Sequence, residues 1–263
     1  MILKKQVPEV VRKGYFIGLL ENIGDFVNFN GRFFKEVIRP PFFWNEFLRQ
    51  CYQMGNKSLP LVAITSFIIG LVLTLQSRPS LVTFGAESML PGLIANSIVK
   101  EIGPMITALL CAGKIGSGIG AELGSMRVTE QIDAMEVSAM NPFKFLVVTR
   151  VLATTCMIPL LIIFTDMIGL YGSYAAMNIH SDINLYRYFT EAFSHLDFND
   201  ILPAFIKSYF FGFAIGIIGS FKGYSVKGGT ESVGRASNEA VVNGSVAIFL
   251  LDMIAVQITD LLY

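Results

Sequence analysis

The chain has 263 residues, of which 53% are hydrophobic and only 15% are charged. Soluble domains carry about 25% charged residues, so this composition excludes an ordinary soluble domain and favours a bundle of membrane helices. The formal net charge is zero, so charge gives no reason to expect a nucleic-acid partner. The three cysteines are too few and too scattered for a disulfide framework or a zinc site.

Residues 1–57 hold nine Lys or Arg and one long amphipathic pattern. Its apolar residues recur at roughly helical spacing and are Phe16, Leu20, Ile23, Val27 and Phe34. Charged side chains stand between them, which is typical of a helix lying in a membrane interface. A soluble amphipathic helix packed on a partner would show the same pattern, and that alternative stays open. The segment "RPPFFWNEF" should end this helix, because adjacent prolines cannot continue it.

Five apolar segments that are long enough to cross a bilayer follow. They cover about residues 60–76, 93–120, 145–176, 201–221 and 241–262. A spanning helix needs about 20 residues, so the third segment is too long for one upright span, while half of it would be too short. We therefore expect one long tilted helix there, with Pro159 as the place where it would kink.

The distribution of positive charge predicts the orientation. With the N-terminus inside, the cytoplasmic segments 1–57, 114–150 and 222–235 carry nine, four and three Lys or Arg. The outer side keeps only Arg78, Lys100, Arg187 and Lys207. This asymmetry follows the positive-inside rule. We expect an all-α membrane protein with an N-terminal interfacial amphipathic helix, five transmembrane helices, a cytoplasmic N-terminus and a periplasmic C-terminus.

A polar stretch, residues 120–142, lies on the cytoplasmic side between the second and third spans. Its apolar residues form one face of a short helix at about 127–140 and are Val128, Ile132, Met135 and Ala139. Thr129 is placed to cap the start, and Asn141 and Pro142 end the helix. A solvated connector is the plainer interpretation. The apolar stripe instead favours a helix that docks into a cleft on a cytoplasmic partner.

At this stretch the chain resembles a known family. The segment "KEIGPMITALLCAGKIGSGIGAELGSMRVTEQIDAMEVSAMNP", most specifically "AELGSMRVTEQIDAM", is similar to the signature of the MlaE/YrbE permeases. The segment "FKGYSVKGGTESVGRASNEAVV" resembles their second cytoplasmic loop. The resemblance covers roughly residues 50–263. It implies the permease subunit of an ABC lipid transporter, with residues 1–57 as the interfacial region and 58–263 as the permease domain.

The resemblance also implies partners and a location. It implies phospholipid transport between the membrane and a periplasmic MCE-domain protein, a function tied to outer-membrane lipid asymmetry. This chain would form a homodimer on two ATPase subunits in the inner membrane of a Gram-negative-type bacterium. The segment "GGTESVGRAS" has Arg235 and Ala236 where a phosphate loop needs Lys and Ser or Thr. We therefore expect ATP and Mg on the partner, and no cofactor, metal ligand or catalytic residue on this chain.

The resemblance places two groups of candidate site residues. The ATPase-coupling residues would be Arg127, Glu130, Gln131, Asp133, Ala134 and Glu136. The lipid-binding residues, around a cavity open to the periplasm, would be Leu73, Gln76, Leu81, Phe84, Lys100 and Glu101. Charges within a membrane are costly and often functional. Here Lys100 would meet a phosphate and Glu101 would order the pocket, whereas a simple ion pair is the plainer interpretation.

Other patterns in the sequence do not indicate a single structural or functional role. Small residues recur at four-residue spacing in two sets, which are Gly116, Gly120 and Gly124, and Gly212, Gly216 and Ser220. Such spacing permits close helix contacts, either within the chain or across a dimer seam. We interpret three acidic residues in or near the spans as packing or interface residues, namely Asp166, Asp252 and Asp260. The outer segment 177–200 is a candidate docking surface, with His180 and His195 as surface residues.

Two other classes of function need different features. A secondary transporter of a lipid or amphiphile, driven by an ion gradient, would use paired intramembrane carboxylates between inverted repeats. A membrane enzyme that acts on lipids would need a nucleophile with its base, or metal ligands. The sequence shows neither a repeat nor such a set. An ATPase that co-purifies with the chain would distinguish the ABC transporter from both.

Overall fold

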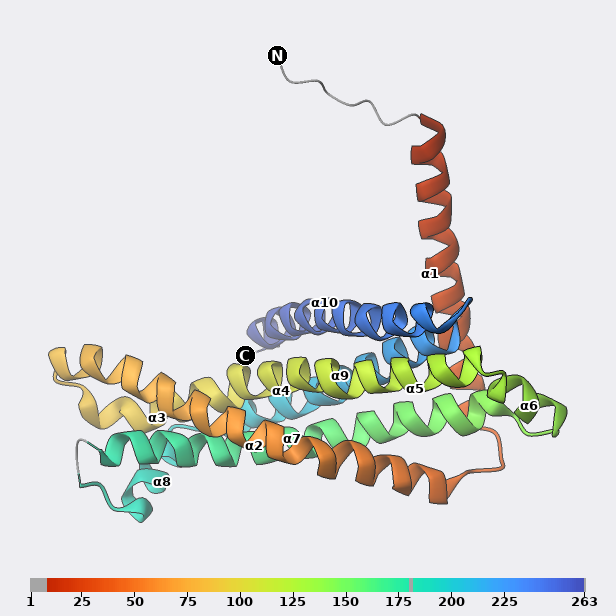
Figure 1. Ribbon diagram of the computed structural model, residues 1–263. Coiled ribbons are helices and arrows are strands. Elements are labelled where there is room, and N and C mark those ends of the chain that lie inside the picture. The colour runs from red at the N-terminus through yellow and green to blue at the C-terminus, as the bar shows by residue number, and fades with distance from the viewer. Residues whose placement is uncertain (1–8, 180–181, 263) are drawn as a thin grey trace. The chain divides into compact units, whose positions relative to one another are not determined.

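The computed structural model describes residues 9–179 and 182–262, and it describes no side chain for residues 9–19, 199 and 262. His180 therefore lies outside the described residues. All regular elements in the described part are helices (Figure 1). The chain divides into two compact units, Met1–Phe42 and Phe43–Tyr263.

The first unit contains the helix α1, which runs from Glu9 to Val37. Its predicted apolar residues are each more than half exposed where their side chains are described, at Leu20, Ile23, Val27 and Phe34. The side chain of Phe16 is not among the described ones. α1 ends before the two prolines and the next helix begins at Trp44, so the predicted break is confirmed. Its location in a membrane interface stays a prediction.

The second unit holds five helical segments that are long and apolar enough to cross a membrane. They are Trp44–Thr83, Glu87–Val128, Phe143–Asn178, Asp200–Tyr224 and Thr230–Leu261. The third is continuous and has Pro159 in its interior, so the prediction of one long helix in place of two short spans is confirmed.

Figure 1 labels the α-helices of this unit, and short η elements lie between some of them. The first two segments consist of α2 (Trp44–Thr83), η1 (Glu87–Met89), α3 (Leu90–Ser97), η2 (Ile98–Ile102), α4 (Gly103–Cys111), η3 (Ala112–Gly116) and α5 (Ser117–Val128). The remainder comprises α6 (Gln131–Val137), η4 (Phe143–Val148), α7 (Thr149–Asn178), α8 (Leu185–Ser194), α9 (Phe198–Tyr224) and α10 (Thr230–Leu262). Of the short η elements, η2, η3 and η4 are π-helical turns.

The helix α2 is longer than the sequence indicated. We expected the first span to begin at Pro60, but the helix starts at Trp44 and Pro60 lies inside it. Its polar first half buries residues at four-residue spacing, including Glu46, Gln50 and Met54. Because α2 packs along α7, tertiary contacts stabilise this part of the helix where hydropathy does not.

Glycines set how closely the helices pack. A Cβ on Gly172 of α7 would overlap the carbonyl oxygen of Phe67 of α2. A Cβ on Gly212 of α9 would lie 2.7 Å from the carbonyl oxygen of Thr154 of α7. Gly120 of α5 makes a looser contact with α10, because a Cβ there would lie 3.3 Å from the carbonyl oxygen of Ala236. Gly120 and Gly212 belong to the two predicted sets of small residues, and the contacts described for them are contacts within this chain.

A second, smaller core closes the end of the unit that holds α3 and α8. Tyr188 and Ala192 of α8 pack there with Leu90 and Ile94 of α3 and with Leu170 of α7. Burial raises the pKa of Tyr188 to about 12, so its phenol stays neutral at physiological pH. The apolar side of α8 is thus fixed to the bundle.

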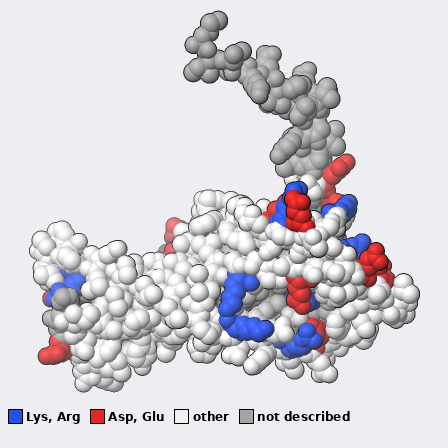
Figure 2. Space-filling view, viewed as in Figure 1, with Lys and Arg blue, Asp and Glu red and all other residues white. Residues whose placement is uncertain are grey.

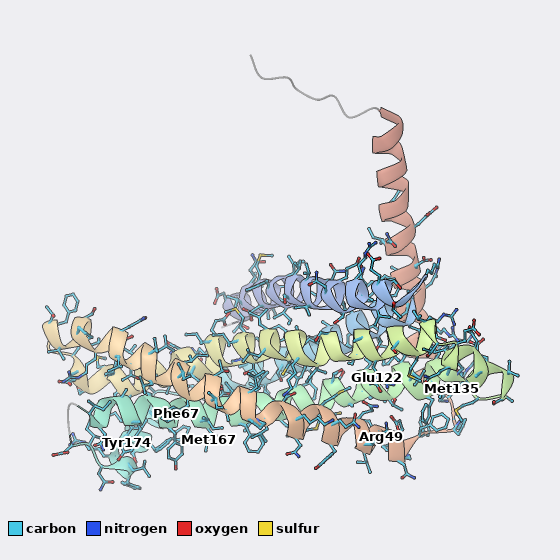
Figure 3. The ribbon with its side chains drawn as sticks, in the orientation of Figure 1. Arg49, Phe67, Glu122, Met135, Met167 and Tyr174 are labelled. Carbon is cyan, nitrogen blue, oxygen red and sulfur yellow. The ribbon has the colours of Figure 1, made fainter. Side chains whose placement is uncertain are left out.

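The surface of the second unit is uneven in charge. Figure 2 shows charged side chains gathered over the half that holds α5 and α6, and a smaller group at the opposite end. Phe67 and Met167 lie between these ends, on α2 and α7, whereas Glu122 and Met135 lie near α6 (Figure 3). On the face shown in Figure 2, few charged side chains lie between these ends, which suits a hydrocarbon layer. Together with the five apolar segments, this distribution indicates a multi-pass membrane protein.

Candidate functional site

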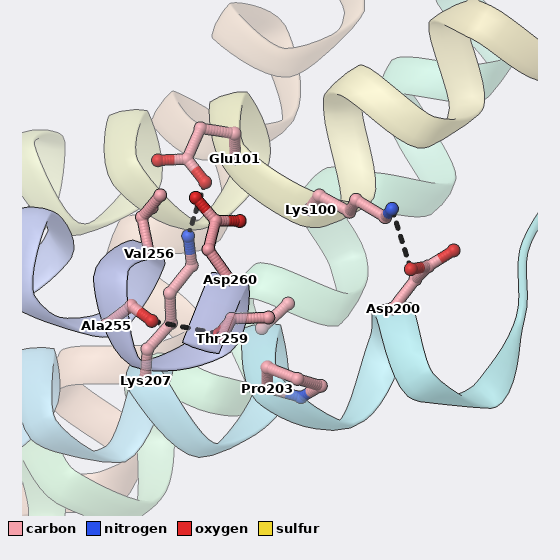
Figure 4. A pocket seen from close by; sticks show the side chains of 10 residues that line it. Lys100, Glu101, Asp200, Pro203, Lys207, Ala255, Val256, Thr259 and Asp260 are labelled. Atoms are coloured by element: carbon pink, nitrogen blue, oxygen red, sulfur yellow. Dashed lines mark hydrogen bonds and ion pairs between the residues drawn. The ribbon is translucent and has the colours of Figure 1, made fainter. Parts of the chain in front are cut away.

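A cavity of about 190 Å³ lies where η2 meets α9 and the end of α10. Its lining comes from three different spans (Figure 4). The lining residues are Lys100, Glu101, Asp200, Pro203, Ala204, Lys207, Ala255, Val256, Thr259 and Asp260. The structure thus brings the predicted pair, Lys100 and Glu101, together with charged residues distant in sequence.

Lys207 of α9 is the centre of an ion-pair network. Its Nζ donates to Glu101 Oε2 at 2.8 Å and to Asp252 Oδ1 at 2.9 Å. The side chains of Lys207 and Asp252 are only 6% and 8% exposed, whereas that of Glu101 is 41% exposed. A buried ammonium without a partner would be costly, and the two carboxylates offset that cost. The network joins the second, fourth and fifth spans.

Lys100 has a different partner. Its Nζ lies 2.6 Å from Asp200 Oδ1 at the start of α9 (Figure 4). Lys100 and Glu101 are both part of η2, a π-helical turn, and such turns are frequent at functional sites. Consecutive helical residues point about 100° apart, which explains why these neighbours reach different partners.

The sequence did not assign Lys207, Asp200 or Asp252 to the site. The sequence predicts Asp252 to be a packing or interface residue, and the structure shows that it is buried and is also a direct ion-pair partner of Lys207. One signal was present in the sequence. Lys207 and Asp252 are isolated charges inside otherwise apolar segments, and such charges usually pair with one another.

The other lipid-binding candidates do not line this cavity. Leu73 and Leu81 pack against the smaller core formed by α3, α7 and α8. Gln76 is exposed on α2, and Phe84, just after α2, is 83% exposed. Of the six predicted residues, only Lys100 and Glu101 meet in the cavity, and contact of the other four with acyl chains remains a prediction.

The coupling-helix candidates lie at the opposite end of the spans, around α6. This helix begins at Gln131, after Glu130 adopts a left-handed conformation with φ of 57°. Thr129 does not cap α6, because its Oγ1 donates to the carbonyl oxygen of Ser125 at 2.8 Å, in the last turn of α5. Arg127 belongs to α5, and α6 is shorter than the sequence indicated.

The apolar face of α6 points into this chain. Ile132 is fully buried and Met135 packs against the larger hydrophobic core of the spans, the main core, so these two residues of the stripe are not available to a partner. The outward side chains are Gln131, Asp133, Ala134, Glu136 and Val137. Val137 is 90% exposed. Any docking surface on α6 is therefore mainly polar, with Val137 as an apolar contact.

Two ion pairs lie at this end of the spans, one between α5 and α6 and one between α5 and α7. Arg127 Nη1 lies 2.6 Å from Asp133 Oδ1 and links α5 to α6. Arg150 of α7, whose side chain is 2% exposed, lies 2.9 Å from Glu122 Oε1 of α5. Arg150 also donates to the carbonyl oxygen of Leu146 at 2.9 Å. An ion pair thus joins α6 to the second span, and a second ion pair joins the second span to the third.

Comparison with known proteins places these features in a family. The model of the family described as permease MlaE matches residues 47–258. The chain is 37% identical over 242 residues to a probable ABC transporter permease protein of Rickettsia felis, covering 92% of this chain and 93% of that protein. It is 32% identical over 212 residues to the intermembrane phospholipid transport system permease protein MlaE of Haemophilus influenzae, covering 80% and 81%. The chain therefore belongs to the MlaE family of ABC transporter permeases.

Proposed function

We propose that this chain moves phospholipids between the inner membrane and a periplasmic MCE-domain carrier protein. The observation that carries the proposal is the charged cavity beside the apolar spans. A phospholipid has a charged head and long apolar chains, so its site should combine apolar walls with a few polar groups. The name of the Haemophilus influenzae relative, which refers to intermembrane phospholipid transport, supports the same substrate class.

The proposal includes ATPase partners and a second copy of this chain. Related proteins are named ABC transporter permeases, and an ABC transporter draws its energy from ATP. ATP and Mg would bind to two separate ATPase subunits. Closed two-fold symmetry is the commonest arrangement of oligomers, so two copies of this permease would face the two ATPases.

The helix α6 is the part of this chain proposed to contact the ATPase. Its outward face combines carboxylates with the exposed Val137, an ion pair attaches it to the second span, and a further ion pair joins the second span to the third. Asp133 is already paired with Arg127, so Glu130 and Glu136 are the better carboxylates for a test. Both are exposed, and a charge reversal there leaves the packing of Ile132 intact.

We expect Glu130→Lys with Glu136→Lys to reduce ATP-dependent phospholipid transfer at least tenfold in vesicles that contain the permease and its ATPase. The reason is that reversed charge on the docking face weakens association with the ATPase or its coupling. Glu21→Lys, a charge reversal on an exposed residue of α1, is the matched control and should retain transfer. Unchanged assembly and transfer in the double variant would contradict the proposed coupling surface.

The ion-pair network favours one alternative. Paired carboxylates within a membrane are also what a transporter driven by an ion gradient uses. The same vesicles distinguish the two. Transfer that follows an imposed ion gradient and ignores ATP would support the alternative, whereas transfer that requires ATP supports the ABC transporter.

A further inference from the structure

We propose that the cavity around Glu101 and Lys207 prefers phospholipids whose headgroup carries an ammonium over phospholipids with an anionic headgroup. This inference rests on the proposed phospholipid function. Its starting point is the balance of charge in and beside the cavity, where carboxylates outnumber ammonium groups by four to two. The carboxylates are Glu101, Asp200, Asp252 and Asp260, and the ammonium groups are Lys100 and Lys207.

Both ammonium groups are already paired. Lys100 lies 2.6 Å from Asp200, and the buried Lys207 is held between Glu101 and Asp252 at 2.8 and 2.9 Å. A neighbouring carboxylate therefore offsets the charge of each cation, which weakens its attraction for the phosphate of a lipid. Lys100, which the sequence assigned to a phosphate, is therefore poorly placed to attract one.

The acceptors, by contrast, are not all used. Glu101 and Asp252 share one ammonium group. Asp260 is exposed at the cavity and has no ion-pair partner among the described residues. The hydroxyl of Thr259 donates to the carbonyl oxygen of Ala255 at 2.9 Å, so it offers no free hydrogen to a phosphate. The lining thus has acceptors in excess, which suits a ligand group that donates.

A primary ammonium fits this arrangement better than a metal ion. Within the described part of the chain, no three His, Cys, Asp or Glu side chains gather closely enough to hold a metal. An ammonium group carries three donors and does not need ligands in a fixed geometry. The volume of about 190 Å³ is below the usual size of a site for a drug-sized ligand, so it suits a headgroup whose acyl chains lie outside.

The test measures which lipids the permease–ATPase complex retains. The complex is purified in mild detergent, and the ratio of bound phosphatidylethanolamine to phosphatidylglycerol is compared by mass spectrometry with the ratio in the source membrane. We expect at least twofold enrichment of phosphatidylethanolamine. Asp260→Asn should reduce this enrichment about two- to fivefold, the range for one partly exposed charge pair, and Asp260→Lys should favour phosphatidylglycerol. Asp182→Asn, outside the cavity, should change nothing.

A second measurement tests the contribution of the ammonium group of the lipid by itself. The delipidated complex is titrated with lysophosphatidylethanolamine and with its N-acetylated form, which differs in lacking the ammonium charge. We expect the N-acetylated lipid to bind about two- to fivefold more weakly. The same titration with MgCl₂ alone, followed by EDTA, tests an inorganic cation as the source of the positive charge, and we expect it to leave lipid preference unchanged.

The outcomes separate the two proposals. Bound lipid at the membrane ratio, enrichment of phosphatidylglycerol, or a preference that Mg²⁺ abolishes would overturn the headgroup inference. Each of these results would leave phospholipid transport intact. Absence of both bound lipid and ATP-dependent transfer would instead contradict the proposed function.

Discussion

At the scale of single residues, Lys207 determines the electrostatics of the cavity. Its ammonium is the shared partner of Glu101 and Asp252, and both Lys207 and Asp252 are almost fully buried. Removing one partner of a buried ion pair leaves an uncompensated charge, which costs about 3–5 kcal/mol. The pair formed by Lys100 and Asp200 is more exposed, and such pairs contribute about 0–1 kcal/mol.

We therefore expect Lys207→Met to lower the free energy of unfolding by about 3–5 kcal/mol, and Lys100→Met by no more than about 1 kcal/mol. The measurement is unfolding of the purified permease in detergent, followed by loss of helical signal. Adding Glu101→Gln and Asp252→Leu to Lys207→Met should restore much of the stability, because no buried charge remains unpaired. Equal effects of the two lysine variants would show that the network does not stabilise the fold.

At the scale of elements, the fit of α2 against α7 depends on backbone-to-backbone approach. Gly70 and Gly172 each face a carbonyl group of the opposite helix, and a methyl group at either position would overlap it. Overpacking of this kind costs about 1–3 kcal/mol, and more when backbone must move. Gly118 of α5 is a contrasting case, because no described atom outside its own stretch of α5 lies within 4 Å of a Cβ there.

The same substitution should therefore have opposite effects at two helical glycines. Gly172→Ala should lower the midpoint of thermal unfolding, since α2 must separate from α7. Gly118→Ala should leave it unchanged or raise it, because alanine favours a helix by about 1 kcal/mol over glycine. Both are measured on the detergent-purified protein. A Gly172→Ala variant as stable as the native chain would mean that the α2–α7 contact is looser than the structure shows.

Some features of the elements could be predicted from sequence patterns alone. The long third span and the break before α2 follow from hydropathy and from the two prolines, which are local properties. The direction of the apolar face of α6 is different. A stripe such as Ile132 and Met135 indicates that a helix has an apolar side, but it does not say whether that side meets the same chain or a partner. Packing with the main core decided this.

At the scale of the whole molecule, orientation follows from positive charge and has a direct test. We expect α6 in the cytoplasm and α8 in the periplasm. After Cys51, Cys111 and Cys156 are replaced by Ala, Val137→Cys and Tyr186→Cys place single thiols on residues that are 90% and 79% exposed. A membrane-impermeant maleimide should label Tyr186→Cys in intact spheroplasts and Val137→Cys only after lysis. The reverse pattern would contradict the orientation, and the cysteine-free chain is the control.

The sequence alone determined that the chain is helical, that it has five apolar segments and which segments carry the positive charge. These properties depend on local composition, because partition into a membrane is close to additive along a segment. Only the tertiary structure decided which charges meet. Lys207 is 106 positions from Glu101 and 45 from Asp252, and their contact requires the rotation and packing of three helices. That rotation depends on close contacts at glycines and on a π-helical turn, which hydropathy and charge counts do not encode.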